Sequence, residues 1–476
     1  MQPSRYRIGG LVGSRASRTG RWFDPTIWAL ALATISWLIV MVRQVPCRPA
    51  DGGFPGPFMR LCYSDIPTLY LGRDVSKGAG LYTEVPLEYP VLIGYFMDAA
   101  RTLTKLFADV SPEASYQAQV TASQIFFQIS SVGLFACFIG LVVIHLRIGR
   151  RSPQSSHGGR VRQWDALLIA ASPVVMANGL INWDLLPLVL TSFGLLIWSR
   201  RMPLLAGGVL GLAFAAKFYP VLVLIAITLV CLRAARYRPI VALWVGAMVS
   251  WAVVNLPIMV SAWSGWTQFW TMNADRGADL GSIWYVFKLI GLDIPGLSAI
   301  AFLCMALCGI AVGWLVMIAP RRPRIGQIAL LLLVIFLIFN KVYSPQYSLW
   351  LLPLVVLARP KLVDVAIWTL GELLYFVAIW GFLDGLLGPG TGSEPFYWAA
   401  VIIRISLQLW LALRVIDDIL RPWEDPIRLP LVDDPLGGVL DHSADAGWLL
   451  AAQMRRSRPG PPPARALIEA AGEPAQ

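Results

Sequence analysis

The feature that most limits how this chain can fold is a series of twelve apolar runs separated by polar connections. Hydrophobic residues make up 57% of the 476 positions and charged residues only 14%, whereas a soluble domain carries about 25% charged residues. Runs of this kind cross a bilayer as helices, because a helix satisfies its own backbone polar groups in lipid. The sequence therefore predicts an all-α, polytopic membrane protein with about 10–12 transmembrane helices.

The apolar runs also divide the chain into three parts. Several of them fall short of the roughly 20 residues of a perpendicular span, so tilted, re-entrant or broken helices are expected. We expect a basic N-terminal segment at 1–24, a transmembrane domain at 25–415 and a mostly disordered tail at 416–476, which is rich in Asp, Arg and Pro and has too few apolar residues after Leu450 for a core. The runs cover residues 25–42, 125–146, 164–180, 185–198, 203–216, 218–232, 240–256, 297–319, 325–339, 347–357, 363–383 and 396–413.

The basic residues set the expected orientation of the chain, whose net charge is +11. Lysine and arginine cluster in alternate connections rather than in one patch, which is typical of cytoplasmic loops and not of a nucleic-acid surface. We therefore expect a multi-pass protein of the cell membrane with both termini in the cytoplasm and no nucleic-acid partner. The long connections 43–114, 257–296 and 384–394 then lie outside the cell, and function is expected on that extracytoplasmic face.

The first outer connection carries three carboxylates, Asp65, Glu84 and Glu88, among aromatic residues and prolines. A stiff, partly desolvated carboxylate can serve as a general base, and the alternative interpretation is a solvated loop acid. Cys47 and Cys62 share this connection, so a disulfide between them is open in an extracytoplasmic setting.

Two lysines stand beside aromatic rings where apolar runs end: Lys217 in the segment 215–220 and Lys341 in the segment 339–347. Lysine is costly at the membrane edge and needs a partner there, and an anion such as a phosphate is the obvious candidate. Lys341 could instead be an anchor that snorkels to the interface. Asp184, in the turn 178–184, is either a substrate contact or a helix cap.

The connection 263–288 is rich in tryptophan, which suits either membrane anchoring or stacking against a sugar ring. Its Arg276 either contacts a phosphate or pairs with Asp275 or Asp279. The sequence has no G-x-x-x-x-G-K-[ST] phosphate loop, which argues against an ATP-driven pump, and its three histidines are too isolated to form a metal site. We expect no bound metal and no cofactor, although a divalent-ion requirement stays open.

Six motifs, in this order, resemble glycosyltransferase family 87 of actinobacteria: 64–67, 88–90, 182–184, 217–220, 273–284 and 341–347. The resemblance implies a GT-C-like membrane transferase that moves mannose, with inversion, from a polyprenyl-phosphate donor to an extracytoplasmic lipid or glycan acceptor. Such enzymes place a catalytic acid in the first outer loop, which corresponds to Asp65 here.

The hypothesis assigns roles to the residues that the motifs carry. Asp65 would take the proton of the acceptor hydroxyl, while cations would stabilise the departing phosphate. The rival hypothesis is a transporter or flippase for a lipid-linked sugar or an organic anion, but such proteins often show inverted repeats and place their sites near the bilayer midplane. Beside the catalytic Asp65, the expected substrate-binding residues are Glu88, Tyr89, Asp184, Lys217, Tyr219, Arg276, Lys341, Gln346 and Tyr347.

Overall fold

The structure is a computed structural model. It describes residues 24–47, 56–73, 75–77, 80–85, 87–111, 113–150, 162–428 and 434–449. Nearly all of the predicted basic N-terminal segment and the last part of the predicted tail lie outside the described residues.

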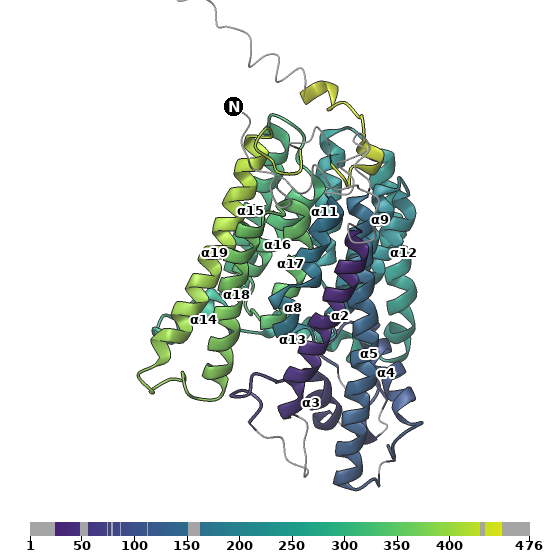
Figure 1. The fold of residues 1–476 in the computed structure, drawn as a ribbon, viewed down its shortest axis with the longest axis vertical. Helices are drawn as coiled ribbons and strands as arrows, with labels where there is room; N and C mark the ends of the chain where they lie inside the picture. The colour runs from purple at the N-terminus through teal and green to yellow at the C-terminus, as the bar shows by residue number, and fades with distance from the viewer. Residues whose placement is uncertain are drawn as a thin grey trace, which may run out of the picture.

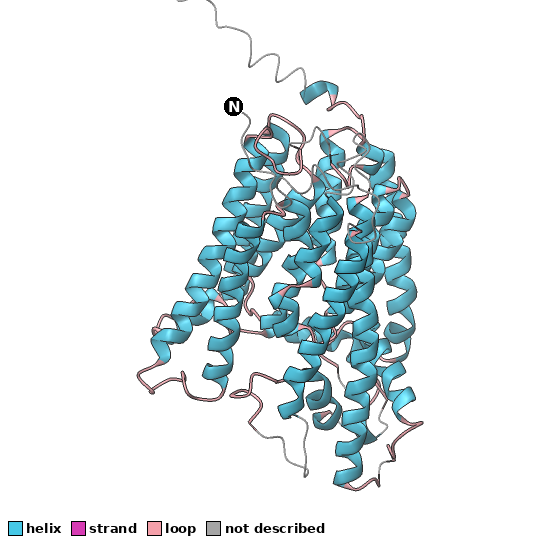
Figure 2. Ribbon diagram, in the orientation of Figure 1, coloured by secondary structure: helices cyan, strands magenta, loops and turns pink. Residues whose placement is uncertain are grey.

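Six helices are long and apolar enough to cross a membrane, and they run roughly alongside one another (Figures 1 and 2). Six shorter apolar segments pack among them. Together these helices coincide with the twelve predicted runs, which confirms the all-α, polytopic class. The long helices are α2 (Pro25–Gln44), α5 (Tyr116–Gly149), α12 (Tyr237–Ser261), α15 (Leu297–Ile318), α18 (Leu362–Leu383) and α19 (Glu394–Leu420). The shorter ones are α7 (Leu167–Ala170) with α8 (Pro173–Asn178), α9 (Leu185–Ser199), α10 (Pro203–Ala216), α11 (Pro220–Arg233), α16 (Ile325–Phe339) and α17 (Ser348–Ala358).

The two ends of the bundle differ. One end, here called the loop face, carries α3 (Asp65–Gly72), α4 (Val91–Thr104), α13 (Trp263–Asp275) and α14 (Ile283–Leu289). The opposite end, the tail face, carries the chain that follows α19.

The turns between the short helices lie inside the bundle on the loop face, and we call this inset region the recess. At 1.5 Å per residue, helices of 11 to 15 residues reach about 17–23 Å, less than the roughly 30 Å of a bilayer's hydrocarbon core. By contrast, α5 has 34 residues and reaches about 51 Å. The turns 178–184, 217–219 and 340–347, which join these short helices, therefore end inside the bundle. In Figure 1, α8 accordingly ends well inside the level of α3.

The predicted run 164–180 is broken rather than continuous. A 3-10 turn at Trp164–Ala166 leads into α7, and α8 begins anew at Pro173 behind its cap, Ser172. The break follows from Pro173, which has no N–H to donate and disfavours helical geometry in the residue before it.

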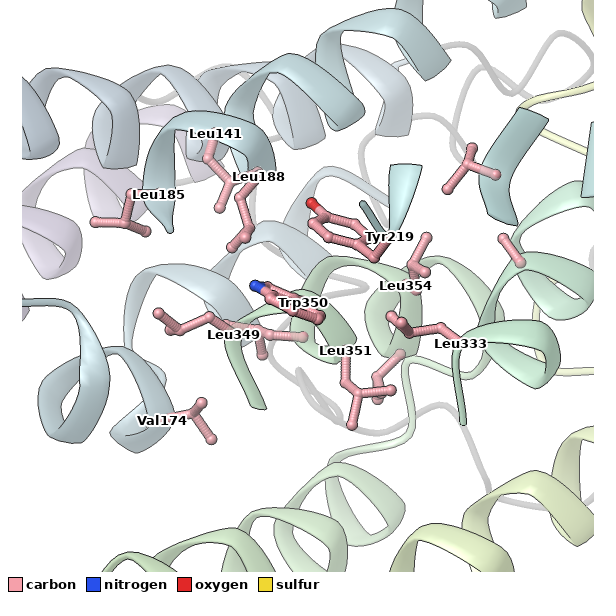
Figure 3. Packing of buried hydrophobic residues seen from close by; sticks show 14 of the residues in the cluster. Leu141, Val174, Leu185, Leu188, Tyr219, Leu333, Leu349, Trp350, Leu351 and Leu354 are labelled. Atoms are coloured by element: carbon pink, nitrogen blue, oxygen red, sulfur yellow. The ribbon is translucent and has the colours of Figure 1, made fainter. Parts of the chain in front are cut away.

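The centre of the bundle is α17, in which every residue from Ser348 to Ala358 is buried. A helix that is apolar on all sides belongs inside a bundle rather than at its lipid surface. Figure 3 shows how its residues Leu349, Trp350 and Leu354 meet side chains of the neighbouring helices. Trp350 stacks on Tyr219 with ring centroids 5.0 Å apart.

The described parts of the predicted tail pack against the bundle, and the rest of it, 429–433 and 450–476, lies outside the described residues. α19 continues to Leu420, beyond the predicted domain end at 415, and residues 421–428 and 434–449 lie against the tail face. Arg324 donates to both carboxylate oxygens of Asp425 at 2.8 and 3.0 Å, and Arg233 pairs with Asp445 at 2.8 Å. Buried ion pairs and the buried apolar side chains of Ile427, Leu436 and Leu440 together hold these parts against the bundle.

We expect Asp425→Ala to destabilise the protein by about 3–5 kcal/mol, because it leaves the Arg324 guanidinium buried without its counter-charge. Thermal unfolding in detergent measures the effect. Asp417→Ala is the matched control, since Asp417 is 32% exposed in its ion pairs with Arg414 and Arg421 and should cost no more than about 1 kcal/mol. Equal losses in the two variants would contradict a structural role for the docked tail.

Candidate active site

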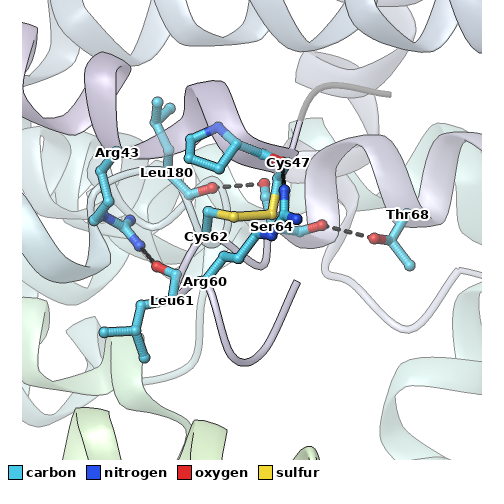
Figure 4. The surroundings of a disulfide bond; sticks show 9 residues. Arg43, Cys47, Arg60, Leu61, Cys62, Ser64, Thr68 and Leu180 are labelled. Atoms are coloured by element: carbon cyan, nitrogen blue, oxygen red, sulfur yellow. Dashed lines mark hydrogen bonds between the residues drawn. A yellow bond between two sulfur atoms is a disulfide. The ribbon is translucent and has the colours of Figure 1, made fainter. Parts of the chain in front are cut away.

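The segment that leads into α3 is tied to the end of α2 by a disulfide between Cys47 and Cys62, whose Cα atoms lie 5.8 Å apart (Figure 4). This is the disulfide that the sequence left open. Arg43, near the end of α2, donates to the carbonyl oxygens of Leu61 and Met176 and holds the same segment. The path of the chain before α3 is therefore set by covalent and polar contacts.

Ser64 caps α3 and joins it to the turn 178–184. Its hydroxyl donates to the carbonyl oxygen of Leu180 at 2.6 Å and accepts from the backbone of Ile66. The backbone N–H of Asp65 donates to Ile181 at 2.7 Å. Asp65 thus occupies the first position of α3, directly above the recess that the short helices leave.

Three polar side chains surround the Asp65 carboxylate, which is half-buried. The Tyr63 hydroxyl donates to Oδ1 at 2.9 Å, while the Tyr89 hydroxyl and the Asn182 amide donate to Oδ2 at 3.3 and 3.0 Å. The same amide also donates to the Tyr89 hydroxyl at 2.7 Å. Burial raises the pKa of Asp65, although the Tyr63 hydrogen bond and the positive charge of Lys217 oppose the rise. A carboxylate held in this way is oriented and made more basic, as a general base requires.

Lys217 and Asp184 form an ion pair beside this carboxylate. The two charged groups lie 3.1 Å apart, with the Asp184 side chain fully buried and that of Lys217 12% exposed. Trp350 donates its indole N–H to Oδ1 of Asp184 at 2.8 Å, and Oδ2 of Asp184 has no hydrogen-bond partner. Asp184 occupies the N-cap position of α9, but its side chain makes no capping hydrogen bond and pairs with Lys217 instead.

Aromatic rings pack against this ion pair. The Lys217 ammonium lies 5.2 Å from the ring centroid of Tyr89 and 5.8 Å from that of Trp350, within cation–π range. Tyr347 stacks on the same tryptophan at 4.0 Å. Tyr219 lies deeper, with its hydroxyl bonded to Thr191 at 3.1 Å, and therefore supports Trp350 from the core.

Gln346 is buried next to Tyr347, and its side-chain oxygen has no hydrogen-bond partner. An unpartnered buried acceptor is costly unless a ligand or water completes it. Oδ2 of Asp184 is likewise a buried acceptor without a hydrogen-bond partner among the described residues. Both atoms can accept hydrogen bonds from the hydroxyls of a bound molecule.

Three expected site residues have other partners. Glu88 forms an ion pair with Arg73. Arg276 pairs with Asp279 at 2.8 Å, which was the alternative interpretation of that arginine. The Lys341 ammonium donates to the carbonyl oxygen of Ala274 at 2.8 Å and to Ser298 at 2.9 Å.

The structure therefore brings together only part of the predicted set. Asp65 and Tyr89 contact each other directly. Lys217 lies over the Tyr89 ring and pairs with Asp184. It also lies over Trp350, on which Tyr347 and Tyr219 stack. Among the described contacts, none links Glu88, Arg276 or Lys341 to Asp65 or Lys217. Sequence reasoning placed Asn182 in a motif but did not count it as a site residue, and it did not identify Trp350 at all. Asn182 could have been found, since it lies two residues before Asp184.

Aromatic rings line a narrow groove of only about 10 Å³ beside Tyr89, between α10, α12 and α13. Its walls include Phe214 and Phe218, which flank Lys217 in sequence, together with three tryptophans. Phe218 is 38% exposed, so the groove is not sealed. The tryptophans are Trp251, Trp266 and Trp270.

Among the described residues, no three His, Cys, Asp or Glu side chains lie close enough together to hold a metal ion. The arrangement instead offers one oriented carboxylate, one ammonium next to it, and unpartnered acceptors around them. Such a site can take a proton from a hydroxyl and can stabilise negative charge on a neighbouring group.

The model of glycosyltransferase family 87 matches residues 116–339, a range that contains Asn182, Asp184 and Lys217. A search of curated proteins found no match to this chain. The family match agrees with the resemblance that the sequence motifs carry; it covers α5 to α16 but neither α3 with Asp65 nor α17 with Trp350. Over residues 116–339 the chain matches glycosyltransferase family 87, which indicates a membrane glycosyltransferase, and its apolar helices are those of a multi-pass membrane protein.

Proposed function

We propose that this glycosyltransferase moves mannose, with inversion, from a polyprenyl-phosphate donor to a lipid or glycan acceptor, with Asp65 as the general base. The observation that carries the proposal is the juxtaposition of the oriented Asp65 carboxylate and the Lys217 ammonium on either side of Tyr89. A base and a cation on either side of one tyrosine suit a reaction in which a hydroxyl loses a proton while a phosphate departs.

The aromatic groove supports a lipid-linked donor. An isoprenoid chain needs an apolar surface that continues into the bilayer, and Phe214, Phe218 and tryptophans form such a wall next to Lys217; the groove, at about 10 Å³, would have to open to admit the chain. A phosphate at the end of such a chain would meet the Lys217 ammonium at the mouth of the groove. Oδ2 of Asp184 and the Gln346 oxygen would then accept hydrogen bonds from the sugar hydroxyls.

The reaction is a single displacement at the anomeric carbon of the donor sugar. The acceptor oxygen forms a bond to that carbon as the bond from the carbon to the phosphate oxygen breaks, and the leaving phosphate keeps the bonding electrons. Asp65 takes the proton of the acceptor hydroxyl, and Lys217 stabilises the charge that grows on the phosphate. Attack from the face opposite the leaving group inverts the configuration.

The same proposal puts the loop face outside the cell. Connections on the tail face carry Arg200, Arg201, Arg233, Arg236, Arg321 and Arg322. A bias of this kind is typical of the cytoplasmic side, which supports an orientation with both chain ends inside and the site outside. A disulfide on the loop face suits an oxidising, extracytoplasmic compartment.

The test uses the purified full chain in nanodiscs with radiolabelled polyprenyl-phosphate mannose and a mixed actinobacterial lipid extract. We expect label to move to a new lipid in the wild type and not in Asp65→Asn. Label that stays on the donor while the donor crosses to the opposite leaflet would instead identify a flippase, the rival hypothesis.

The pH dependence of transfer follows from the raised pKa of Asp65. Only the carboxylate accepts a proton, so kcat/KM should fall as pH decreases through that pKa, at a higher pH than for an exposed aspartate with a pKa of about 3.9. Tyr63→Phe removes a hydrogen bond that stabilises the carboxylate, raises the pKa further, and should move this acid limb to higher pH. The pH–rate profile measures the shift. Tyr237→Phe, an exposed tyrosine elsewhere, should leave the limb in place; an unmoved limb in Tyr63→Phe would contradict the assignment of Asp65 as base.

A further inference from the structure

The turn 340–347, which supplies Gln346 and Tyr347 to the site, lies against the segment 279–282. Two backbone hydrogen bonds of 2.9 Å connect them, from the N–H of Asp279 to Lys341 and from the N–H of Tyr343 to Leu280. Both segments lie within motifs that carry the family resemblance, although the segment 279–282 contributes no side chain to the site described above. Its place beside the turn therefore asks for a different role.

The two segments can lie this close because residue 281 is a glycine. Its φ of +74° is in the left-handed region, and a Cβ atom there would lie 2.3 Å from the carbonyl oxygen of Tyr343. The N–H of Gly281 donates to the Tyr397 hydroxyl at 2.9 Å, and its carbonyl oxygen accepts from Arg404 at 2.9 Å. Side chains of α19 thus bind both backbone groups of Gly281.

Tyr343, in the middle of the turn, is held at its hydroxyl and on the face of its ring. The hydroxyl donates to Oε2 of Glu372, in α18, at 2.8 Å. The Gln408 amide donates to the other oxygen of that carboxyl group at 2.7 Å and to the Tyr343 hydroxyl at 3.1 Å. The Arg404 guanidinium covers the ring, with Cζ 3.5 Å from the centroid. Contacts at both places fix the position and the rotation of this side chain.

Glu372 and Arg404 are costly where they stand. They are 3% and 1% exposed, and they belong to two helices that are long enough to cross a membrane. Two nitrogens of Arg404, Nε and Nη1, have no hydrogen-bond partner among the described residues. Well-packed apolar side chains often hold neighbouring helices at lower cost. What the two charged residues share is Tyr343, so the position of that tyrosine is what the cost secures.

We infer that Glu372, through Tyr343, is a positioning residue for the donor sugar: it fixes the turn 340–347 so that the Gln346 oxygen faces the sugar hydroxyls. The inference rests on the proposed function and deepens it. Gln346 follows Tyr343 by three residues, with Pro345 between them. Because the ring of proline fixes φ, a displacement of Tyr343 carries Gln346 with it.

Two variants loosen the contact without emptying the core. Tyr343→Phe keeps the ring that Arg404 covers and removes only the hydroxyl. Glu372→Gln keeps the size of the side chain and removes its charge. Asp384→Asn is the matched control for the charge, because Asp384 is an exposed carboxylate directly after α18. Thermal unfolding identifies any variant that does not fold.

Hydrogen exchange of the full chain in nanodiscs, without substrate, measures the turn directly. In Tyr343→Phe and in Glu372→Gln, peptides that cover 279–282 and 340–347 should exchange several-fold faster, because the hydrogen bonds between these segments open more often. Asp384→Asn should exchange like the wild type. Unchanged exchange in the folded Tyr343→Phe variant would overturn the inference.

Steady-state transfer of label then separates positioning from a general loss of structure. In both variants the KM for the donor should rise about three- to tenfold, the value of one hydrogen bond, while the KM for the acceptor stays unchanged. The acid limb of the pH–rate profile, which reports Asp65, should stay in place. A smaller amount of folded protein would lower kcat alone, so a fall in kcat with an unchanged KM for the donor would contradict a positioning role.

A double variant tests whether the effect passes through Gln346. Gln346→Ala removes the oxygen itself, so adding Tyr343→Phe should raise the KM for the donor no further. Rises that multiply would show that Glu372 does not act through Gln346. If the wild type transfers no label, the proposed function fails together with the donor role, and the exchange result alone decides whether Glu372 holds the turn.

Discussion

Replacing Asp65 by asparagine is expected to lower kcat by about 10³-fold, within the range that a positioned general base contributes. The asparagine keeps the size of the side chain and can still accept the Tyr63 hydrogen bond, but it cannot take a proton. Its amide group meets the amide of Asn182 where a carboxylate oxygen stood, so stability should change by no more than about 1–2 kcal/mol. Initial rates of label transfer, with thermal unfolding as a check of folding, measure both quantities.

Glu84→Gln is the control for this substitution. Glu84 is an exposed carboxylate of the same loop that accepts a hydrogen bond from the backbone of Gly80, and glutamine can still accept it. Transfer by Glu84→Gln should match the wild type. If folded Asp65→Asn kept full transfer activity, Asp65 would not be the base, and the proposed mechanism would fail at its first step.

Replacing Lys217 by methionine should lower both activity and stability. The loss of a preorganised cation next to a departing phosphate is expected to reduce kcat by about 10²–10³-fold. The substitution also leaves the fully buried Asp184 carboxylate without its counter-charge, which should cost about 3–5 kcal/mol of stability. Lys288→Met removes an exposed lysine of the loop face and should change stability by no more than about 0.5 kcal/mol.

A double variant separates the two roles of Lys217. Lys217→Met combined with Asp184→Asn removes both charges of the pair, so no buried charge is left uncompensated. Stability should return most of the way to that of the wild type while transfer stays low. Recovery of transfer together with stability would mean that Lys217 acts only through the fold.

The helices of this protein could be predicted well from the sequence, whereas the site could be predicted only in part. Asp65, Lys217 and Asp184 stood out because a charged group near an apolar run is costly and therefore noticeable. Lys341 stood out for the same reason, yet its ammonium is bound to Ala274 and Ser298. The cost of a charge indicates that a partner exists, but it does not say whether that partner is a ligand or the protein itself.

The tail shows a second limit of prediction from sequence, because there a buried charge was not noticed at all. Its Asp, Arg and Pro content, with few apolar residues after Leu450, predicted a mostly disordered segment. Asp425 is nevertheless fully buried against Arg324. Composition counts apolar residues and cannot recognise a charge that lies 101 positions from its partner in sequence.

The sequence by itself determined that this chain forms apolar helices, where they lie, and which of them are too short to span a bilayer. These properties are local, since each run must satisfy its own backbone in lipid. Only the tertiary structure decided which side chains meet. Asn182 reaches Asp65 across 117 positions, and Trp350 reaches Asp184 across 166. Those contacts depend on the depth at which separate short helices end and on how they pack around α17, and neither is encoded in any single stretch of the chain.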